Sequence, residues 1–505
     1  MKRDRGFNKN PDGASMDRAD QRKENPDGSA ENSTDQRKEG KKAAVRNGVE
    51  ENSTNQITEG VIWKQILLFF FPILLGSVFQ QLYNTADAVI VGRCAGKEAL
   101  SAVGGSTASI INIFVGFFTG IASGATVVTA HFFGGNQEKR VSETVHTSFM
   151  ISLCAGVVFA ALGMACAPVM LRLLQTPEEL FAQSLSYMRI YFAATPANLF
   201  YIMGAGILRA AGDSRRPLYF LIVSCIANIP LDFLFVAGLR MGAKGAAIAT
   251  VLCQIMSAVM VFVVLNRERA CYRLVPAEMF HCSGRILKRV LWIGIPAGLQ
   301  SVTYGLSNSV IQAKVNSFGT DNIAAWSAYT KLDGLYWMTV SAMGIAVTTF
   351  VGQNIGAGKT ERAKRSMWVC MGMTMVMAGV LSIFFYSFAE IFFSFFVEDM
   401  EVIALGVSQL HFLTRFYLIY VVVEILSGTL RGMECVVVPT IISILLVCVL
   451  RVAWVGVALR FNNTMETVMM SYPVTWIAAA LAFIIYYIFY IKKNGLRPQK
   501  TQSRP

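Results

Sequence analysis

Two aspartates lie inside apolar stretches in the first half of the chain. One is Asp87, and the other ends the sequence Asn228-Ile-Pro-Leu-Asp232. Asn228 and Asp232 are four residues apart and share one face of a helix, while Pro230 leaves the carbonyl of Ile226 without its usual helical partner. Such oxygens suit a hard monovalent cation, and two carboxylates meeting in a low dielectric can also carry a proton. The alternative is that each aspartate only caps or hydrogen-bonds a neighbouring helix.

The second half carries a different set of charges within its apolar stretches. We expect Lys331, Asp333, Arg415, Glu424 and Arg451 to be buried there. Glu424 and Arg451 stand on neighbouring stretches at comparable depth, so they could pair, either as a structural contact or as part of a substrate or relay site. The candidate substrate or relay residues are Asn84, Asn308, Asp333, Glu424 and Arg451.

The sequence offers no motif for catalysis. Gly352-Gln-Asn-Ile-Gly-Ala-Gly-Lys-Thr360 ends like a phosphate-binding loop, but five residues separate its first glycine from Gly-Lys-Thr, and that loop needs four. The ten cysteines include no Cys-x-x-Cys pair, and the four histidines are scattered. We therefore expect no enzyme activity, catalytic residue, metal site or cofactor, and we expect an ion gradient to supply the energy.

Composition places these residues in membrane helices. The chain is 54% hydrophobic and 15% charged, with a mean hydropathy of +0.48, which is typical of an integral membrane protein. Stretches long enough to cross a bilayer, about 20 residues each, predict an all-α protein with twelve transmembrane helices. They cover roughly residues 66–91, 101–130, 141–170, 183–208, 217–237, 243–265, 289–316, 323–351, 367–391, 404–430, 437–459 and 467–491.

The apolar part of the sequence contains an internal repeat. Pro72-Ile-Leu-Leu-Gly-Ser77 returns as Pro296-Ala-Gly-Leu-Gln-Ser301, 224 positions later, and two further segments return with an offset of 222. So constant an offset indicates duplication of a whole six-helix unit. The two lobes should be related by a parallel pseudo-twofold axis along the membrane normal, an arrangement typical of transporters.

Charge placement predicts the orientation. If both termini are cytoplasmic, the inside loops and the C-terminal tail carry 21 Lys and Arg residues and the outside loops carry six. The net charge of +13 then reflects topology and not affinity for nucleic acid. We expect a multi-pass protein of the cell (inner) membrane that acts as a monomer in the lipid bilayer.

These patterns also give the domain boundaries. The parts are a disordered cytoplasmic tail over 1–60, a first lobe over 61–265, a cytoplasmic linker over 266–288, a second lobe over 289–491 and a cytoplasmic tail over 492–505.

The two copies differ at the acidic positions. Asp87 aligns with Ile311 and Asp232 with Trp454, while Asn228 aligns with Leu450. Any ion chemistry of these acids is therefore expected in the first lobe alone.

Several motifs together resemble the multidrug and toxic compound extrusion (MATE) transporters, in particular the DinF-like bacterial branch. They are Tyr83-Asn-Thr-Ala-Asp87, the paired Leu-Arg segments that end at Pro217 and Pro439, Gly212-Asp-Ser-Arg-Arg-Pro217, and the Gly-Gln-Asn-x-Gly-Ala-Gly loop from Gly352. The resemblance spans about residues 61–492. It implies a twelve-helix, two-lobe antiporter that exports organic, often cationic, compounds against inward Na+ or H+. It also implies a first-lobe cation site, whose matching residues here are Asp87, Asn228, Asp232 and Thr250.

The residues and the resemblance together predict a secondary active exporter of cationic or amphipathic small molecules, working by alternating access with H+ or Na+ as the coupling ion. The alternative within transport is a flippase or exporter of lipid-linked saccharide or another lipid, which would favour a cavity lined by basic residues from both lobes. A rival of another class is a membrane scaffold or receptor with a regulatory tail, but that hypothesis gives no reason for acids in one repeat only.

Overall fold

The computed structural model describes residues 57–279 and 281–494, and within these ranges the chain is helical without a strand. Most of the expected tails over 1–60 and 492–505 lies outside the described residues, which include only 57–60 and 492–494 of them. Runs of apolar residues with few interruptions explain the long helices, since a backbone in hydrocarbon must satisfy its hydrogen bonds within one segment.

The first lobe contains six spans. One of them is bent, and another passes from an α-helix into a π-turn. Pro196 is the second residue of α6, and at this point the fourth span is divided into two helices at an angle of 50°. The elements are α2 (Ile62–Gly104), α3 (Ser106–Gly134), α4 (Glu138–Leu173), the pair α5 (Glu178–Ala193) and α6 (Thr195–Ala210), α7 (Arg215–Asp232) with the π-turn η1 (Phe233–Gly238), and α8 (Ala243–Arg267).

The second lobe repeats this order, including a span bent by 50° between α13 and α14. Its elements are α9 (Gly284–Val315), α10 (Thr320–Gly356), α11 (Thr360–Ser387), the short α12 (Ala389–Ser394), the pair α13 (Met400–Thr414) and α14 (Tyr417–Gly432), α15 (Val437–Ile442) with the π-turn η4 (Ser443–Val449) and α16 (Leu450–Ala458), and α17 (Met465–Asn494). Short 3-10 turns η2 (Pro276–Glu278) and η3 (Asn316–Phe318) flank α9.

The helices confirm the all-α, two-lobe prediction. Among the described residues, nine helices and two bent pairs are long and apolar enough to cross a membrane. The 32-residue α9 lies where the seventh stretch was predicted. Some boundaries differ: α2 continues through a kink at Gly96 (φ 88°) to Gly104, well past the predicted end of the first span near residue 91.

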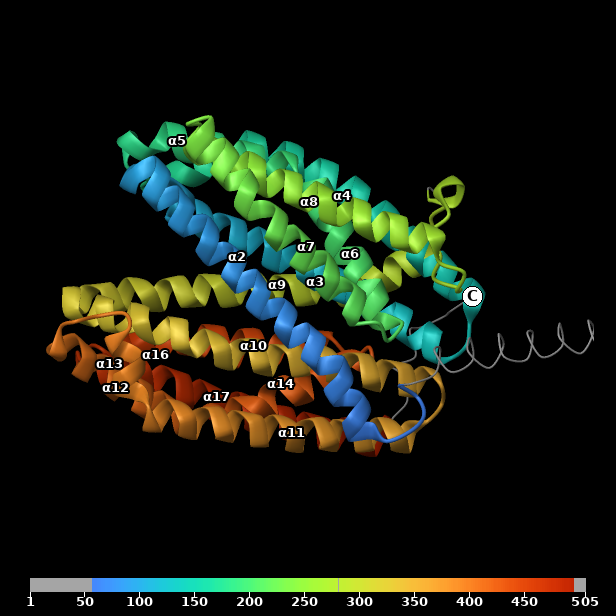
Figure 1. Ribbon diagram of the computed structural model, residues 1–505. Helices are drawn as coiled ribbons and strands as arrows, with labels where there is room; N and C mark the ends of the chain where they lie inside the picture. Colours follow the sequence, from blue (N-terminus) through green and yellow to red (C-terminus); the bar gives the residue numbers. More distant parts are fainter. Residues whose placement is uncertain (1–56, 280, 495–505) are drawn as a thin grey trace, which may run out of the picture. The chain divides into compact units, whose positions relative to one another are not determined.

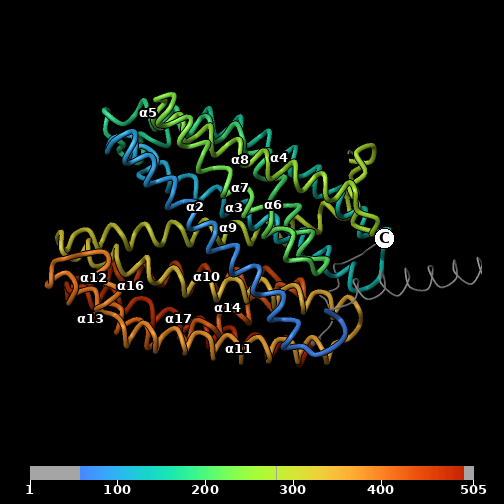
Figure 2. The backbone as a smooth tube through the Cα atoms, viewed as in Figure 1, coloured from blue at the N-terminus to red at the C-terminus, as the bar shows by residue number. Residues whose placement is uncertain are grey.

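The first helix belongs to both lobes. Figures 1 and 2 show α2 running obliquely from the first-lobe helices to the layer of yellow and orange helices of the second lobe. Its early residues Ile66, Phe69 and Phe70 are buried in the second-lobe core, whereas Ile90 and Val91 are buried in a first-lobe cluster. A change at one end of α2 therefore acts on both lobes.

Glycines allow the lobes to approach closely along α3 and α9. A Cβ atom at Gly120 would meet the backbone of Gly298, and one at Gly124 would meet the backbone of Gly294. Small residues are typical of close helix pairs in membranes because dispersion contacts replace the hydrophobic driving force.

The lobes also meet at the end of the molecule that carries loops 134–138, 211–215 and 356–360, which we call the basic end. A Cβ at Gly134 would fall on the backbone of Gln353, and one at Gly356 would fall on the backbone of His131. Nε2 of Gln353 donates to the carbonyl of Ala210 at 2.6 Å. The basic end is therefore closed.

A charged cluster covers the same contact. The Arg289 guanidinium donates two hydrogen bonds to the Glu434 carboxylate, one of them 2.9 Å long. The guanidinium carbon lies 4.6 Å from the ring centre of Phe132, and Nδ1 of His131 is 3.9 Å from a Glu434 oxygen. Since Phe132 and His131 belong to the first lobe, this cluster joins the two lobes.

The residues before α2 are tied to the second lobe at this end. Arg362 on α11 donates to the carbonyls of Ile57, Glu59 and Gly60, and Ile57 is buried in the second-lobe core. Residues 57–60 thus form a strap, which we define as the segment held by Arg362.

The expected linker packs on the first lobe. The amide of Val275 donates to Nε2 of His146 at 3.0 Å, and Leu274 is fully buried. Burial also raises the pKa of the Tyr272 hydroxyl to about 12, so this side chain is neutral at physiological pH.

Candidate functional site

The structure brings together the four residues that the sequence and the resemblance assign to a first-lobe ion site. Asp87 comes from α2, Asn228 and Asp232 from α7, and Thr250 from α8. Each is buried, with exposed fractions of 8%, 0%, 0% and 6% in that order. We call this group the acid site.

The polar atoms of the acid site are short of partners. Among the described residues, Oδ1 of Asp87, both carboxylate oxygens of Asp232 and both amide atoms of Asn228 are buried without a hydrogen bond. The two carboxyl groups are close enough to interact electrostatically. Buried polar atoms without partners are costly, so this donor set fits a bound monovalent cation or proton.

Two tyrosines that were not predicted from the sequence also lie at the acid site. The Tyr83 hydroxyl donates to Oγ1 of Thr250 at 3.1 Å, and Tyr187 on α5 lies within electrostatic range of Asp87 and Asp232. Tyr83 is one helical turn before Asp87, a spacing that signals a shared face. Tyr187 has no such local signal, because only the packing of α5 brings it near.

The helix that carries Asp232 changes geometry at this point. Helix α7 continues past Pro230, and the π-turn η1 begins at Phe233, directly after Asp232. Wider turns of this kind occur often at functional sites. The backbone geometry therefore changes directly after the residue that carries the carboxyl group.

Four of the five candidate substrate or relay residues line one cavity of about 460 Å³ in the second lobe. Asn308 comes from α9, Asp333 from α10, Glu424 from α14 and Arg451 from α16. The cavity also has an aromatic wall that no sequence pattern predicted, which consists of Tyr304, Trp326, Tyr329, Trp337, Tyr420 and Tyr472.

Asp333 is the most strongly held of these groups. The Tyr417 hydroxyl donates to it at 2.6 Å, and the indole nitrogen of Trp337 donates at 2.7 Å. Trp337 is four residues after Asp333, so this contact follows from helical spacing.

The expected pairing of Glu424 with Arg451 does not occur. No ion pair joins them among the described residues. Arg451 instead lies 4.2 Å from the ring centre of Tyr472 and donates to Oδ1 of Asn308 at 3.4 Å. The aromatic face competes for the guanidinium, so the two charges share the cavity without contact.

Three other predicted positions lie elsewhere. Lys331 and Arg415, expected to be buried, are exposed. Asn84 is exposed as well, and it accepts a hydrogen bond from Gln80 at 3.4 Å. In these cases the helix turns the side chain outward, which apolar composition alone does not reveal.

No group of three or more His, Cys, Asp or Glu side chains within the described ranges is placed to hold a metal ion.

A family profile described as MatE matches residues 72–234 and 296–457, one segment in each lobe. The probable multidrug resistance protein YoeA of Bacillus subtilis is 29% identical over 456 residues, which cover 88% of this chain and 97% of the relative. The probable multidrug resistance protein NorM of Thermotoga maritima is 23% identical, covering 79% and 86%.

Solved structures share the fold. A MATE crystal structure in the bent conformation superposes with a TM-score of 0.80 at 21% identity, covering 86% of this chain and 97% of that chain. A transporter of the MOP superfamily from Pyrococcus furiosus gives a TM-score of 0.81 at 21% identity, covering 87% and 99%. The chain therefore belongs to the MatE family, the multidrug and toxic compound extrusion transporters, and is a multi-pass membrane transporter.

Proposed function

We propose that the chain exports organic, cationic or amphipathic compounds in antiport with H+ or Na+. The observation that carries the proposal is the acid site, where Asp87 and Asp232 lie close together and, within the described part of the chain, Oδ1 of Asp87 and both carboxylate oxygens of Asp232 are buried without a hydrogen bond. A bound cation or proton satisfies these oxygens and removes the repulsion between the carboxylates. Asp87, Asn228, Asp232 and Thr250 would be its ligands.

The second-lobe cavity supports a cationic substrate. Its wall is aromatic, and two carboxylates, Asp333 and Glu424, face one guanidinium, Arg451. Aromatic faces and carboxylates attract organic cations, and apolar walls with few polar groups are typical of small-molecule sites. The relatives named for multidrug resistance agree with this class, although another relative, from Shewanella oneidensis, is named a FAD transporter.

Helix α2 offers a route from ion binding to movement of the lobes. Asp87 lies in its first-lobe part, whereas its beginning packs in the second-lobe core. We propose that neutralising the acid site changes the bends at Pro72, Pro196 or Pro230 and lets the lobes rock. The ion must favour one facing state by a difference in binding free energy, since otherwise no coupling results.

The orientation follows from charge. We propose that the basic end faces the cytoplasm with both chain termini, and that the protein lies in the cell (inner) membrane. Both lobes are in one chain, so we propose that a monomer transports.

The test is efflux from proteoliposomes under an imposed pH or Na+ gradient, with tetraphenylphosphonium as substrate. Asp232→Asn should lose gradient-driven efflux but retain substrate exchange without a gradient. The control is Asp321→Asn, which removes an exposed carboxylate at the start of α10. Gradient-driven efflux at the wild-type rate in Asp232→Asn would refute the ion site. Absence of drug efflux together with movement of lipid-linked saccharide would favour the flippase alternative.

A further inference from the structure

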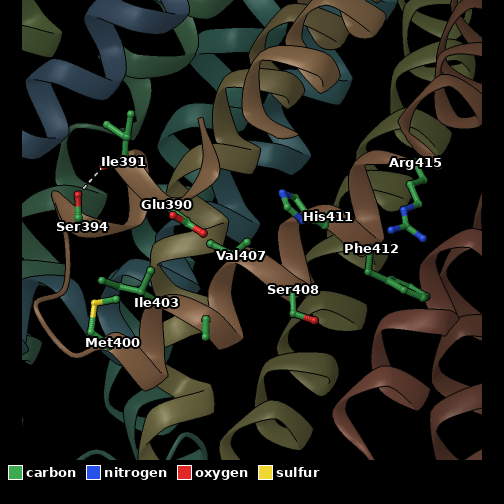
Figure 3. Close-up of a pocket in the computed structure, with 11 residues that line it drawn as sticks. Glu390, Ile391, Ser394, Met400, Ile403, Val407, Ser408, His411, Phe412 and Arg415 are labelled. Carbon is green, nitrogen blue, oxygen red and sulfur yellow. Dashed lines mark hydrogen bonds between the residues drawn. The ribbon is translucent and has the colours of Figure 1, made fainter. Parts of the chain in front are cut away.

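Arg451 lines the second-lobe cavity and is the only arginine or lysine among the described residues whose side chain is buried, with 3% of its surface exposed. It lies seven residues before the end of its span at Ala458, so it is about 10 Å inside the span. Arg415 differs, because it is exposed at one end of another cavity of about 740 Å³ along α12 and α13, shown in Figure 3. A buried charge within a membrane span is costly and by default functional.

The guanidinium of Arg451 has few partners within the protein. Its one hydrogen bond in the described part of the chain is the long contact of 3.4 Å to Oδ1 of Asn308. Its other contact is the face of Tyr472, while Nε is buried without a hydrogen bond. A guanidinium carries five N–H donors, so most of its capacity is unused.

The two acids of the cavity do not neutralise Arg451. Asp333 is near enough to interact with it electrostatically, but its carboxylate already accepts hydrogen bonds from a tyrosine hydroxyl and an indole nitrogen. The Glu424 carboxylate is lodged against α10, since a Cβ at Gly344 would fall on its Oε1. No ion pair joins Arg451 to a carboxylate among the described residues.

The fold itself does not require an arginine at this position. At the offset of 222 the residue of the first lobe that corresponds to Arg451 is Ile229. That isoleucine occupies the equivalent span, α7, and is 39% exposed. The buried charge is therefore a property of the second-lobe cavity and not of the repeated scaffold.

Aromatic rings surround the place where the guanidinium lies. Tyr472 is directly under it, and the ring centre of Trp326 is 6.2 Å from that of Tyr472. Tyr329 continues the same surface, with its ring centre 4.9 Å from that of Trp326. An aromatic compound can pack against these rings while one of its substituents reaches Arg451.

We propose that compounds bound in the second-lobe cavity carry an anionic group, a carboxylate or a sulfonate, attached to an aromatic system. The anionic group accepts two parallel hydrogen bonds from Arg451 and supplies the counter-charge that the protein does not provide. The aromatic part packs against the aromatic wall. This inference rests on the proposed function in taking the cavity as the substrate site, and it narrows the substrates to amphipathic compounds with an acidic group, including zwitterions.

The test compares rhodamine 110, which has a free carboxylate, with rhodamine 123, its methyl ester. Binding to the purified full chain is measured by fluorescence anisotropy without an ion gradient. The wild type should bind rhodamine 110 about tenfold more tightly than the ester, as a charged hydrogen bond predicts. Arg451→Gln should remove this preference by weakening rhodamine 110, whereas Arg451→Lys should keep part of it. The control Arg460→Gln changes an exposed arginine after α16 and should bind both dyes like the wild type.

Three outcomes overturn the proposal. The first is equal affinity of the wild type for acid and ester, which does not depend on how any variant folds. The second is an equal loss of both dyes in an Arg451→Gln protein that elutes like the wild type in size-exclusion chromatography, because the arginine then acts only in packing. The third is displacement of rhodamine 110 by sodium sulfate as effectively as by benzenesulfonate, because the site would then hold a free anion. The proposed function fails separately, if the preference for the acid is present and efflux does not follow an ion gradient.

Discussion

Replacing Gly356 by alanine should open the basic end. A Cβ at this position would fall on the backbone of His131 in the other lobe, at a separation that Cβ atoms essentially never show. The obstacle is backbone and not a flexible side chain, so neither partner can rotate away. Gly356 is not among the glycines with positive φ, and alanine is therefore tolerated by the local backbone. The only relief is for α10 and α3 to move apart.

The size of the effect follows from the cost of overpacking. Extra methyl groups in tightly packed contacts cost about 1–3 kcal/mol. This cost applies to the state in which the basic end is closed and disappears when the lobes separate there. It should therefore shift the ratio of open to closed molecules by about 5- to 150-fold, since 1.4 kcal/mol corresponds to tenfold.

The distance between the lobes can be measured by double electron–electron resonance. Spin labels at Lys139→Cys on α4 and Lys364→Cys on α11, in a background without other cysteines, report on the two lobes at the basic end from exposed positions. Gly356→Ala should add a population at longer distance. Gly372→Ala is the matched control, because a Cβ there meets nothing within 4 Å. The same distance distribution in both variants would refute the steric reasoning.

Three further substitutions test separate contacts. Glu434→Gln leaves Arg289 without its carboxylate, so the unfolding free energy should fall by about 2 kcal/mol, and an unchanged thermal melt contradicts this. Asp333→Asn should weaken tetraphenylphosphonium binding about tenfold, measured by tryptophan fluorescence, and equal affinity would show that the cavity does not recognise charge. Arg362→Gln removes the donors that hold the strap over 57–60, so amide hydrogen exchange there should be faster, and unchanged exchange would mean that the strap is held by packing alone.

The features that could be predicted are those marked by a local or repeated pattern in the sequence. Apolar length predicts the spans, and the duplication predicts the two lobes. The group of Asp87, Asn228 and Asp232 was predictable because a charge in an apolar stretch is conspicuous and because two of these residues are one turn apart. Thr250 came from the family resemblance, since a lone threonine carries no such signal.

The features that were missed depend on tertiary packing. The aromatic wall of the second-lobe cavity consists of residues from several helices, and the same residue types also suit lipid-facing positions. Arg415 was expected to be buried and is exposed, because composition does not fix the rotation of a helix about its axis. The packing of α2 against both lobes was not predicted either, because the apolar residues of a helix do not show which lobe it packs against.

The chemical difference between the two copies makes α2 and the α3–α9 contact central to any coupling. The acid site is confined to the first lobe, while the cavity with Asp333 and Glu424 is confined to the second. Under the proposed function, the ion and the organic substrate bind to different lobes, so neither contacts the other directly. Glycines hold the lobes in backbone contact along α3 and α9, so small rotations there are resisted by packing and not by side-chain rearrangement. Helix α2 is anchored in both cores, so it connects Asp87 to the second lobe through the segment that contains Pro72. In the proposed mechanism, the symmetric scaffold permits the lobes to rock, and the asymmetric placement of charge gives that movement a direction.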